Sequence, residues 1–153
     1  MSIFPTKILL ATDGSREAGL ALTTAADLAK STNSELHVAY VFPIAGQTPP
    51  FPNPILARSA EEMEHELEDA MHQAQSFLDK QVEKVNAEGG EVAESHLVTG
   101  PADREIVHLG EEIDAGLIVM GSRGLGGLRR ALMGSVSDSV VRHAHCPVLV
   151  VRE

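Results

Sequence analysis

Four short runs of apolar residues stand out along the chain, and β-branched residues are frequent in all of them except the first. They cover residues 8–12, 36–41, 117–120 and 148–151. Their hydrophobicity is continuous rather than alternating, which is typical of strands buried on both faces of a parallel sheet. A fifth run, residues 92–98, mixes Glu94 and His96 with apolar residues. We therefore expect it to be a strand at an exposed edge of the sheet.

The segments between these runs carry the three- and four-residue spacing of amphipathic helices. Helices are predicted over residues 15–30, 60–88, 101–113 and 135–144. Ser15 can cap the first helix, Pro101 suits the first turn of the third, and Gly89 ends the long second helix. The predicted buried face of that long helix consists of Met63, Leu67, Ala70, Ala74, Leu78, Val82 and Val85.

Strands and helices thus alternate along the chain, which begins and ends with a strand. This order predicts an α/β fold, a five-stranded parallel doubly wound sheet with helices on both faces. A chain of 153 residues fits one domain, residues 1–153, that can bury about 68–70% of its unfolded surface. Residues 42–58 interrupt the alternation, because they contain five of the eight prolines and suit neither a helix nor a central strand. We expect a surface loop there, with a lid or a partner-binding surface as alternatives.

The composition disfavours several classes of function. The net charge of −10 repels phosphate backbones and anionic lipid, so we expect no general binding of nucleic acid or of membrane surfaces. Four Phe, one Tyr and no Trp leave few rings for stacking on single strands. No apolar run approaches the roughly 20 residues of a membrane-spanning helix, and the first residues lack the features of a secretory signal. We therefore expect a cytoplasmic protein whose one cysteine, Cys146, stays reduced and is packed rather than reactive.

The charge is unevenly distributed along the chain. Residues 59–90 hold nine acidic and two basic residues, which is most simply the solvated face of a helix. Residues 121–145 hold four Arg and one Asp in the most glycine-rich part of the chain. A basic segment of this kind in an acidic protein predicts a local anion site.

Glycines recur at the start of this basic segment. Gly121 and Gly124 follow the fourth strand, and after nine further residues Gly134 and Ser135 open a helix. Glycine lets a backbone approach a phosphate closely, and a helix start offers unpaired N–H groups and a positive dipole end. Further groups that suit an anion are Arg123, Arg129, Arg130 and Ser137. The alternative is that the glycines only shape a turn while Ser135 forms a capping box with Asp138.

Two common nucleotide motifs are not matched. A Walker loop requires Gly-Lys-Ser/Thr, and residues 121–145 contain no Lys. The first strand is followed by Thr12-Asp13-Gly14 rather than by the glycine-rich dinucleotide fingerprint. Asp13 nevertheless ends the first strand, across from Gly121, where ligands of doubly wound sheets bind. A carboxylate there can bind a ribose hydroxyl or Mg²⁺ on phosphates, with a turn or helix-cap aspartate as the alternative.

These residues resemble the ATP-binding branch of the universal stress protein family, over nearly the whole chain. The first strand with its terminal Asp13 is similar to that of the family, and so is the closing segment 146–151. The signature of the branch, Gly-x2-Gly-x9-Gly-Ser/Thr, is complete at Gly121, Gly124, Gly134 and Ser135. The resemblance implies the strand order 3-2-1-4-5, a Rossmann-like fold, and ATP with Mg²⁺ as the ligand.

By position, the resemblance implies adenine near Val41 and the end of the first strand, ribose near Asp13, and phosphates at the start of the last helix. The nucleotide-binding residues that it implies are Ala11, Thr12, Asp13, Val41, Met120, Gly121, Arg123, Gly124, Gly134, Ser135, Val136 and Ser137. Asp13 is also the candidate contact for Mg²⁺ bound to the phosphates. The proline-rich loop 42–58 begins one residue after Val41, so it can change the shape of the entrance to the adenine site.

The final strand, residues 148–151, is an outer strand in the implied order. Its edge is apolar and β-branched and carries no inward charge, and such an edge invites pairing with another chain. A two-fold antiparallel contact between two copies consumes the edge on both subunits. We therefore expect a homodimer through this strand.

Other residues carry weaker signals. His65, Asp69 and His72 fall on neighbouring turns of the acidic helix and form a conceivable metal site. A surface helix rich in carboxylates produces such sets freely, and no recognised ligand spacing is matched. His143 and His145 lie at a helix C-terminus, where imidazole interacts well with the helix dipole.

Three functions remain compatible with the sequence. The first is a regulatory module of the stress response that binds ATP. The second is a slow ATP hydrolase or autophosphorylating enzyme, although beyond Asp13 the sequence shows no evident base or lysine near the glycines. The third is a structural dimer without nucleotide, which the complete glycine signature disfavours.

Overall fold

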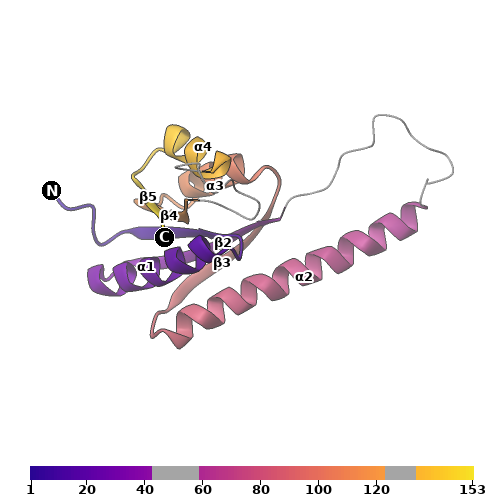
Figure 1. Cartoon of the computed structure of the whole chain (residues 1–153), viewed down its shortest axis with the longest axis horizontal. Coiled ribbons are helices and arrows are strands. Elements are labelled where there is room, and N and C mark those ends of the chain that lie inside the picture. Colours follow the sequence, from indigo (N-terminus) through magenta and orange to yellow (C-terminus); the bar gives the residue numbers. More distant parts are fainter. Residues whose placement is uncertain (43–58, 123–133) are drawn as a thin grey trace.

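The computed structural model describes residues 1–42, 59–122 and 134–153 (Figure 1). The strands are β1 (Lys7–Thr12), β2 (Glu35–Phe42), β3 (Val92–Thr99), β4 (Leu117–Gly121) and β5 (Val148–Val151). The helices are α1 (Arg16–Thr32), α2 (Ala60–Ala87), α3 (Ala102–Glu112) and α4 (Ser135–His143). Strands and helices alternate as predicted, and each observed end lies close to the predicted one.

All five strands are parallel, in the order β3-β2-β1-β4-β5. The predicted doubly wound α/β sheet and its strand order are therefore confirmed. β1 is the central strand, with Ala11 opposite Ala39 of β2 and Met120 of β4. β3 and β5 are the two edge strands, so the expectation of an edge strand at residues 92–98 is also confirmed.

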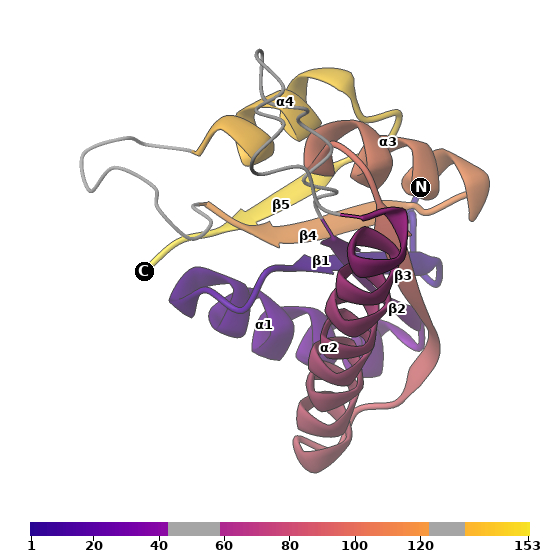
Figure 2. The same ribbon diagram turned by 90° about the vertical axis from the view of Figure 1, so that its right-hand side faces the viewer.

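Helices cover both faces of this sheet, as Figure 2 shows. α1 and α2 lie on one face, over a core that includes Ile8 and Leu78. α3 and α4 lie on the other face, over a core that includes Leu9, Ile106 and Val140. Successive side chains of a strand point to opposite faces, so the neighbours Ile8 and Leu9 are both fully buried but in different layers. The continuous apolar runs of the sequence thus reflect burial on two faces.

The long helix α2 departs from the prediction in its first half. Its buried positions begin only at Ala74, and Met63 and Leu67 keep 59% and 47% of their surface exposed. The predicted burial of Met63 and Leu67 is therefore wrong. The reason is length, because 28 helical residues span about 42 Å whereas the eight residues of β2 span about 26 Å. The first turns of α2 consequently extend past the sheet (Figure 1).

Two helix starts also differ from the prediction. Pro101 is the N-cap of α3 rather than its first helical residue. Gly134 is the N-cap of α4, which makes Ser135 the first helical residue. Ser135 therefore does not form the capping box with Asp138 that was the alternative to an anion site. Asp138 instead accepts a hydrogen bond from Arg142 Nε at 3.0 Å.

Most of the proline-rich loop 42–58 lies outside the described residues. Phe42 is described, and it is the last residue of β2 rather than part of a loop. Among the helices that the structure describes, none has the length and the apolar composition needed to cross a membrane.

Gly121, the last residue of β4, lies against the first turn of α1. A Cβ built on Gly121 would lie 2.8 Å from the carbonyl carbon of Glu17 and 2.9 Å from the backbone nitrogen of Ala18. Contacts this short with backbone atoms are not relieved by rotating a side chain, so a larger residue must displace the helix or the strand. Glycine at this position therefore permits the close packing of α1 against β4.

We expect Gly121→Ala to lower the free energy of unfolding by about 1–3 kcal/mol, because the added methyl group overpacks this contact. Gly19→Ala is the matched control, since a Cβ at this exposed position within α1 meets no atom within 4 Å. The control should raise the free energy of unfolding by about 0.5–1 kcal/mol, because alanine loses less backbone entropy in a helix. Urea denaturation followed by circular dichroism measures both changes. A Gly121→Ala protein as stable as the wild type would contradict the packing role.

Candidate functional site

The carboxyl ends of β1 and β4 lie side by side in the centre of the sheet. β1 leads through α1 to β2 on one side, whereas β4 leads through α4 to β5 on the other. The strand order therefore reverses between β1 and β4, and ligands of doubly wound sheets bind at such a point. α1 and α4 both begin after these strand ends, so their first-turn N–H groups are the available anion donors.

The start of α1 is capped by its own chain. The Ser15 hydroxyl accepts the N–H of Ala18 at 3.1 Å, and Asp13 Oδ1 accepts the N–H of Ser15 at 2.9 Å. Gly14 lies between them with a φ of 81°, a conformation that favours glycine. Asp13 thus fills the role of a turn aspartate. A carboxylate accepts up to about four hydrogen bonds, so this contact is compatible with a ligand at Asp13 as well.

The start of α4 is built differently. Its N-cap is Gly134, which has no side chain to cap the first-turn N–H groups. The N–H of Gly134 donates to the carbonyl of Ser122, and the Ser137 hydroxyl donates to the same carbonyl at 2.8 Å. Ser122 therefore holds the start of α4 against the end of β4. Gly121 and Gly134, which are far apart in the sequence, come together at this end of the sheet.

The two serines predicted at this helix start have different surroundings. Ser137 is 2% exposed, and its hydroxyl also lies 3.1 Å from the carbonyl oxygen of Gly134. Its side chain fixes the position of the helix rather than facing solvent. Ser135 is exposed at the first helical position, so its hydroxyl and N–H are accessible to a ligand.

Four of the predicted apolar residues share one face of the sheet. Ala11 and Met120 are buried in the core beneath α3 and α4, and Val41 and Val136 pack against the same core. They come from three adjacent strands and one helix. The fold thus brings residues from distant parts of the sequence to one side of the reversal point.

Thr12, the last residue of β1, carries a buried hydroxyl. It is 6% exposed, and its Oγ1 has no hydrogen-bond partner among the residues that the structure describes. A buried polar atom without a hydrogen-bond partner lowers the free energy of unfolding by about 1–3 kcal/mol. A bound water, ion or ligand commonly supplies the partner of such an atom. Thr12 lies opposite Tyr40 of β2, at the same end of the sheet as Asp13 and Gly121.

Four predicted contacts of an anion fall outside the described residues: Arg123, Gly124, Arg129 and Arg130. The structure therefore describes both ends of the glycine signature, Gly121 and Gly134, but not the glycine between them.

The residues around the last turn of α4 have partners within the fold. His143 Nδ1 lies 2.8 Å from the carbonyl oxygen of Ser139, near the C-terminus of the helix as predicted. The Ser139 hydroxyl donates to Asp103 Oδ2 at 2.7 Å, and this hydrogen bond lowers the pKa of Asp103.

Burial raises the pKa of the Cys146 thiol, which packs against the core beneath α3 and α4. The predicted packing of Cys146 is confirmed.

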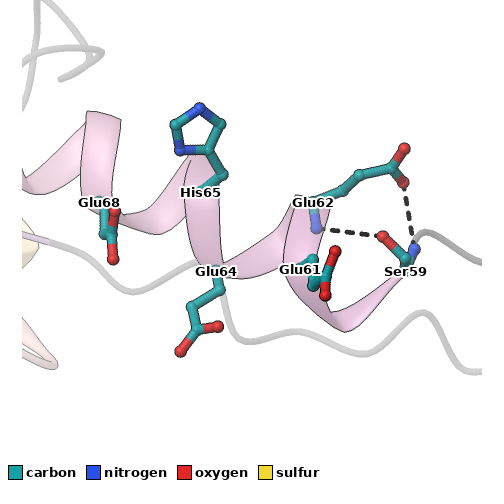
Figure 3. A pocket seen from close by; sticks show the side chains of 6 residues that line it. All are labelled: Ser59, Glu61, Glu62, Glu64, His65 and Glu68. Atoms are coloured by element: carbon teal, nitrogen blue, oxygen red, sulfur yellow. Dashed lines mark hydrogen bonds between the residues drawn. The ribbon is translucent and has the colours of Figure 1, made fainter.

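The first turns of α2 form a shallow hollow that is unsuited to a nucleotide (Figure 3). It is lined by Ser59, Glu61, Glu62, Glu64, His65 and Glu68. The Ser59 hydroxyl already accepts the N–H of Glu62 at 3.1 Å, and Glu64 and His65 point to opposite sides of the helix. The four carboxylates of the lining repel phosphate.

The metal-binding residues predicted on α2 do not come close enough together to share an ion. In the part of the chain that the structure describes, one group of three metal-binding side chains lies close enough together to share an ion, and it is on β2 and β3. His65, Asp69 and His72 do not belong to it and are exposed along α2.

The group on β2 and β3 consists of His37, Glu94 and His96. His37 is 5% exposed and its Nδ1 lies 3.1 Å from His96 Nε2. His37 lies within the predicted strand 36–41, and the apolar pattern of that strand does not predict this contact. A signal was present, because a polar side chain in a strand buried on both faces requires a partner on a neighbouring strand.

Comparison with known proteins agrees with this architecture. The sequence profile of the universal stress protein family matches residues 5–152. A universal stress protein of Methanocaldococcus jannaschii is 33% identical over 147 residues, which cover 96% of this chain and 82% of the relative.

Solved structures show the same fold. Universal stress protein UspA from Lactobacillus plantarum has a TM-score of 0.80 at 24% identity, over 99% of this chain and 100% of that chain. The universal stress protein from Archaeoglobus fulgidus in complex with dAMP has a TM-score of 0.67 at 25% identity, over 98% of this chain and 99% of that chain. Since the profile and the relative both cover nearly all of the sheet and its helices, the chain belongs to the universal stress protein family.

Proposed function

We propose that this chain is a single-domain regulatory module of the stress response that binds ATP with Mg²⁺ at the carboxyl ends of β1 and β4. The observation that carries the proposal is the start of α4, where Gly134 leaves the first-turn N–H groups without a side-chain cap and is held against the end of β4 beside Gly121. The dAMP complex of the Archaeoglobus fulgidus protein supports an adenine nucleotide as the ligand.

The phosphates are proposed to lie at the start of α4. Gly134 leaves the first-turn N–H groups uncapped, and Ser135 adds an exposed hydroxyl. These donors and the positive end of the helix dipole favour an anion. α1 is the less suitable helix, because Ser15 and Asp13 already occupy N–H groups at its start.

The remaining groups of the proposed site follow from their positions. Asp13 contacts the ribose or phosphate-bound Mg²⁺, since carboxylate oxygen suits both. The apolar side chains of Ala11, Val41 and Met120 form the wall toward adenine. Arg123 and Gly124 are proposed as further phosphate contacts on their sequence positions alone.

Binding rather than turnover is the proposed activity. Hydrolysis requires a positioned base or water together with groups that stabilise the transferred phosphoryl. Asp13 is the one carboxylate that we place at the site, and its Oδ1 already holds the N–H of Ser15. Residues 121–145 contain no lysine to stabilise the charge.

We expect the purified protein to release an adenine nucleotide on denaturation, and to bind ATP with Mg²⁺ in calorimetry. Gly134→Val should abolish this binding, because the branched side chain blocks the approach of phosphate to the start of α4. Gly134 has φ −73° and ψ 166°, which valine adopts without strain, so the variant should fold.

Gly19→Ala, on the exposed face of α1, is the control for substitution of a glycine away from the site. A folded Gly134→Val protein that binds ATP as tightly as the wild type would show that the phosphates do not bind at the start of α4. If the wild-type protein releases no nucleotide on denaturation and binds no added ATP, the result would favour the structural dimer without ligand.

Thr12→Val tests the buried hydroxyl directly. The variant removes an unsatisfied buried oxygen and nearly keeps the shape of the side chain, so the free energy of unfolding without nucleotide should rise by about 1 kcal/mol. If the hydroxyl bonds the ligand, the affinity for ATP should fall about tenfold, since one hydrogen bond contributes about 0.5–1.5 kcal/mol. Urea denaturation and calorimetry on the same preparation separate the two effects. An unchanged affinity would exclude Thr12 from the site.

We also propose a homodimer through β5, which is an edge strand. The carbonyl of Pro147 accepts the N–H of Ile118 in β4 at 3.0 Å, and the carbonyl of Val151 accepts the N–H of Ser122, the residue after β4, at 2.9 Å. Alternate residues of a parallel strand bond to the same neighbour, so the N–H groups of Val148 and Val150 point to the outer edge. These outer groups are the donors that a second copy can use.

Val150→Pro removes an outer N–H without removing a hydrogen bond to β4, so the fold should persist while the dimer is lost. Val150→Ala keeps the N–H and is the matched control, which should remain dimeric. Analytical ultracentrifugation at micromolar concentration measures the assembly. A monomeric wild type, or a folded Val150→Pro protein that still dimerises, would rule out this interface.

A further inference from the structure

Two histidines meet between β2 and β3. His37 Nδ1 is 3.1 Å from His96 Nε2 while the ring centroids are 5.4 Å apart, so the rings meet edge to edge. In the register, His37 is opposite Glu94 and His96 is opposite Ala39, which places them on the sheet face beneath α3. The side chains of His37 and His96 are 6% and 14% exposed. This contact is therefore sheltered from water.

The pKa of His96 is shifted below its usual value. Burial is the largest influence and lowers the pKa of His96, whereas the carboxylates of Glu94 and Glu112 oppose this effect. A neutral imidazole has one ring nitrogen with a free lone pair, and this is the form that binds metal ions. In the hydrogen bond between the two rings, a proton occupies the place that a shared metal ion would take.

His37 is oriented through its other nitrogen. Its Nε2 lies 3.3 Å from Glu35 Oε2. An ionised carboxylate only accepts hydrogen bonds, so Nε2 carries the proton and Nδ1 presents its lone pair to His96. A carboxylate that holds the outer nitrogen of a histidine in this way is the usual arrangement behind a zinc ligand.

We propose that His37, His96 and Glu94 form a binding site for a divalent transition-metal ion, with Zn²⁺ as the best match. Two nitrogens on a tetrahedral zinc, each about 2.0–2.1 Å from the ion, lie about 3.3 Å apart, close to the observed 3.1 Å. Glu94 Oε2 lies 3.9 Å from His96 Nε2 on a side chain that is 64% exposed, so it can turn toward the ion. Mg²⁺ and Ca²⁺ would require mainly oxygen ligands.

Only side chains need to move for an ion to bind. His96 Nε2 now donates its proton to the lone pair of His37 Nδ1. For an ion to bind, this proton must move to His96 Nδ1, and each ring must tilt about χ2, a torsion that is soft in histidine, to direct its lone pair at the ion. β3 is an edge strand, so the ion enters from solvent and a water molecule takes the fourth position. His37 lies opposite Leu9 in the middle of β1, away from the proposed nucleotide site beyond Thr12.

Calorimetry with Zn²⁺ on chelator-treated protein tests this site, together with the visible absorption of Co²⁺, whose intensity reports tetrahedral coordination. We expect one ion per chain and a thermal midpoint that rises with Zn²⁺, because the ion binds only the folded state. His96→Ala should abolish the tetrahedral Co²⁺ spectrum and weaken Zn²⁺ binding more than a hundredfold. Glu94→Gln replaces an exposed carboxylate with an amide of the same shape and should weaken binding at least tenfold.

His65→Ala is the control, because His65 is an exposed histidine of α2 that lies outside this group. It should bind Zn²⁺ as the wild type does. Equal affinity in the wild type and His96→Ala, or no Zn²⁺ binding by the wild type, would overturn the proposal. If His96→Ala fails to fold, Glu94→Gln decides, since an unchanged affinity and Co²⁺ spectrum in that variant would overturn the assignment as well.

Discussion

The central strands of this sheet exclude water only if helices cover both of their faces. Ile8 and Leu9 are adjacent in β1 and both fully buried, yet they belong to cores beneath different helices. Each parallel strand must also return to the starting end of the sheet, and helices make these returns. Among the described elements, α1, α3 and α4 therefore begin beyond the carboxyl ends of β1, β3 and β4, and the N–H groups at these helix starts lie at that end of the sheet. The nucleotide site that we propose follows from this requirement.

Close packing at that end gives single residues two roles. Gly121 permits β4 to approach the backbone of α1, and it also occupies a position in the glycine signature. The carbonyl of Ser122 accepts two hydrogen bonds that attach α4. These contacts position the start of α4 before a ligand binds, and preorganisation of this kind limits the affinity lost to rearrangement of the protein. The uncapped N–H groups at the start of α4 are then the donors that a ligand can satisfy.

Burial on two faces also explains the histidine pair. A polar side chain in a strand such as β2 has no water to bond, so it must find a partner in the protein. His37 finds one on the edge strand β3, where His96 and Glu94 keep a path to solvent. One ring nitrogen of the pair forms a hydrogen bond with the other, and the same two nitrogens are positioned to bind an ion. The sheet thus contains two candidate sites for opposite charges, an anion at its carboxyl end and a cation in its β2 and β3 half.

The sequence by itself determined the helices, the strands, their alternation along the chain and the parallel sheet, because periodicity, capping residues and continuous apolar runs are local patterns. The strand order 3-2-1-4-5 followed from the family resemblance rather than from these patterns. It also located Asp13, Gly121 and Gly134 near the reversal point, since the ends of predicted strands and helices follow from those patterns. Only the tertiary structure decided that Gly121 touches α1, that Met63 is exposed and that His37 meets His96. Those facts depend on the length of α2 relative to the sheet and on the register between strands. Such distances join residues far apart in the chain, and no local pattern encodes them.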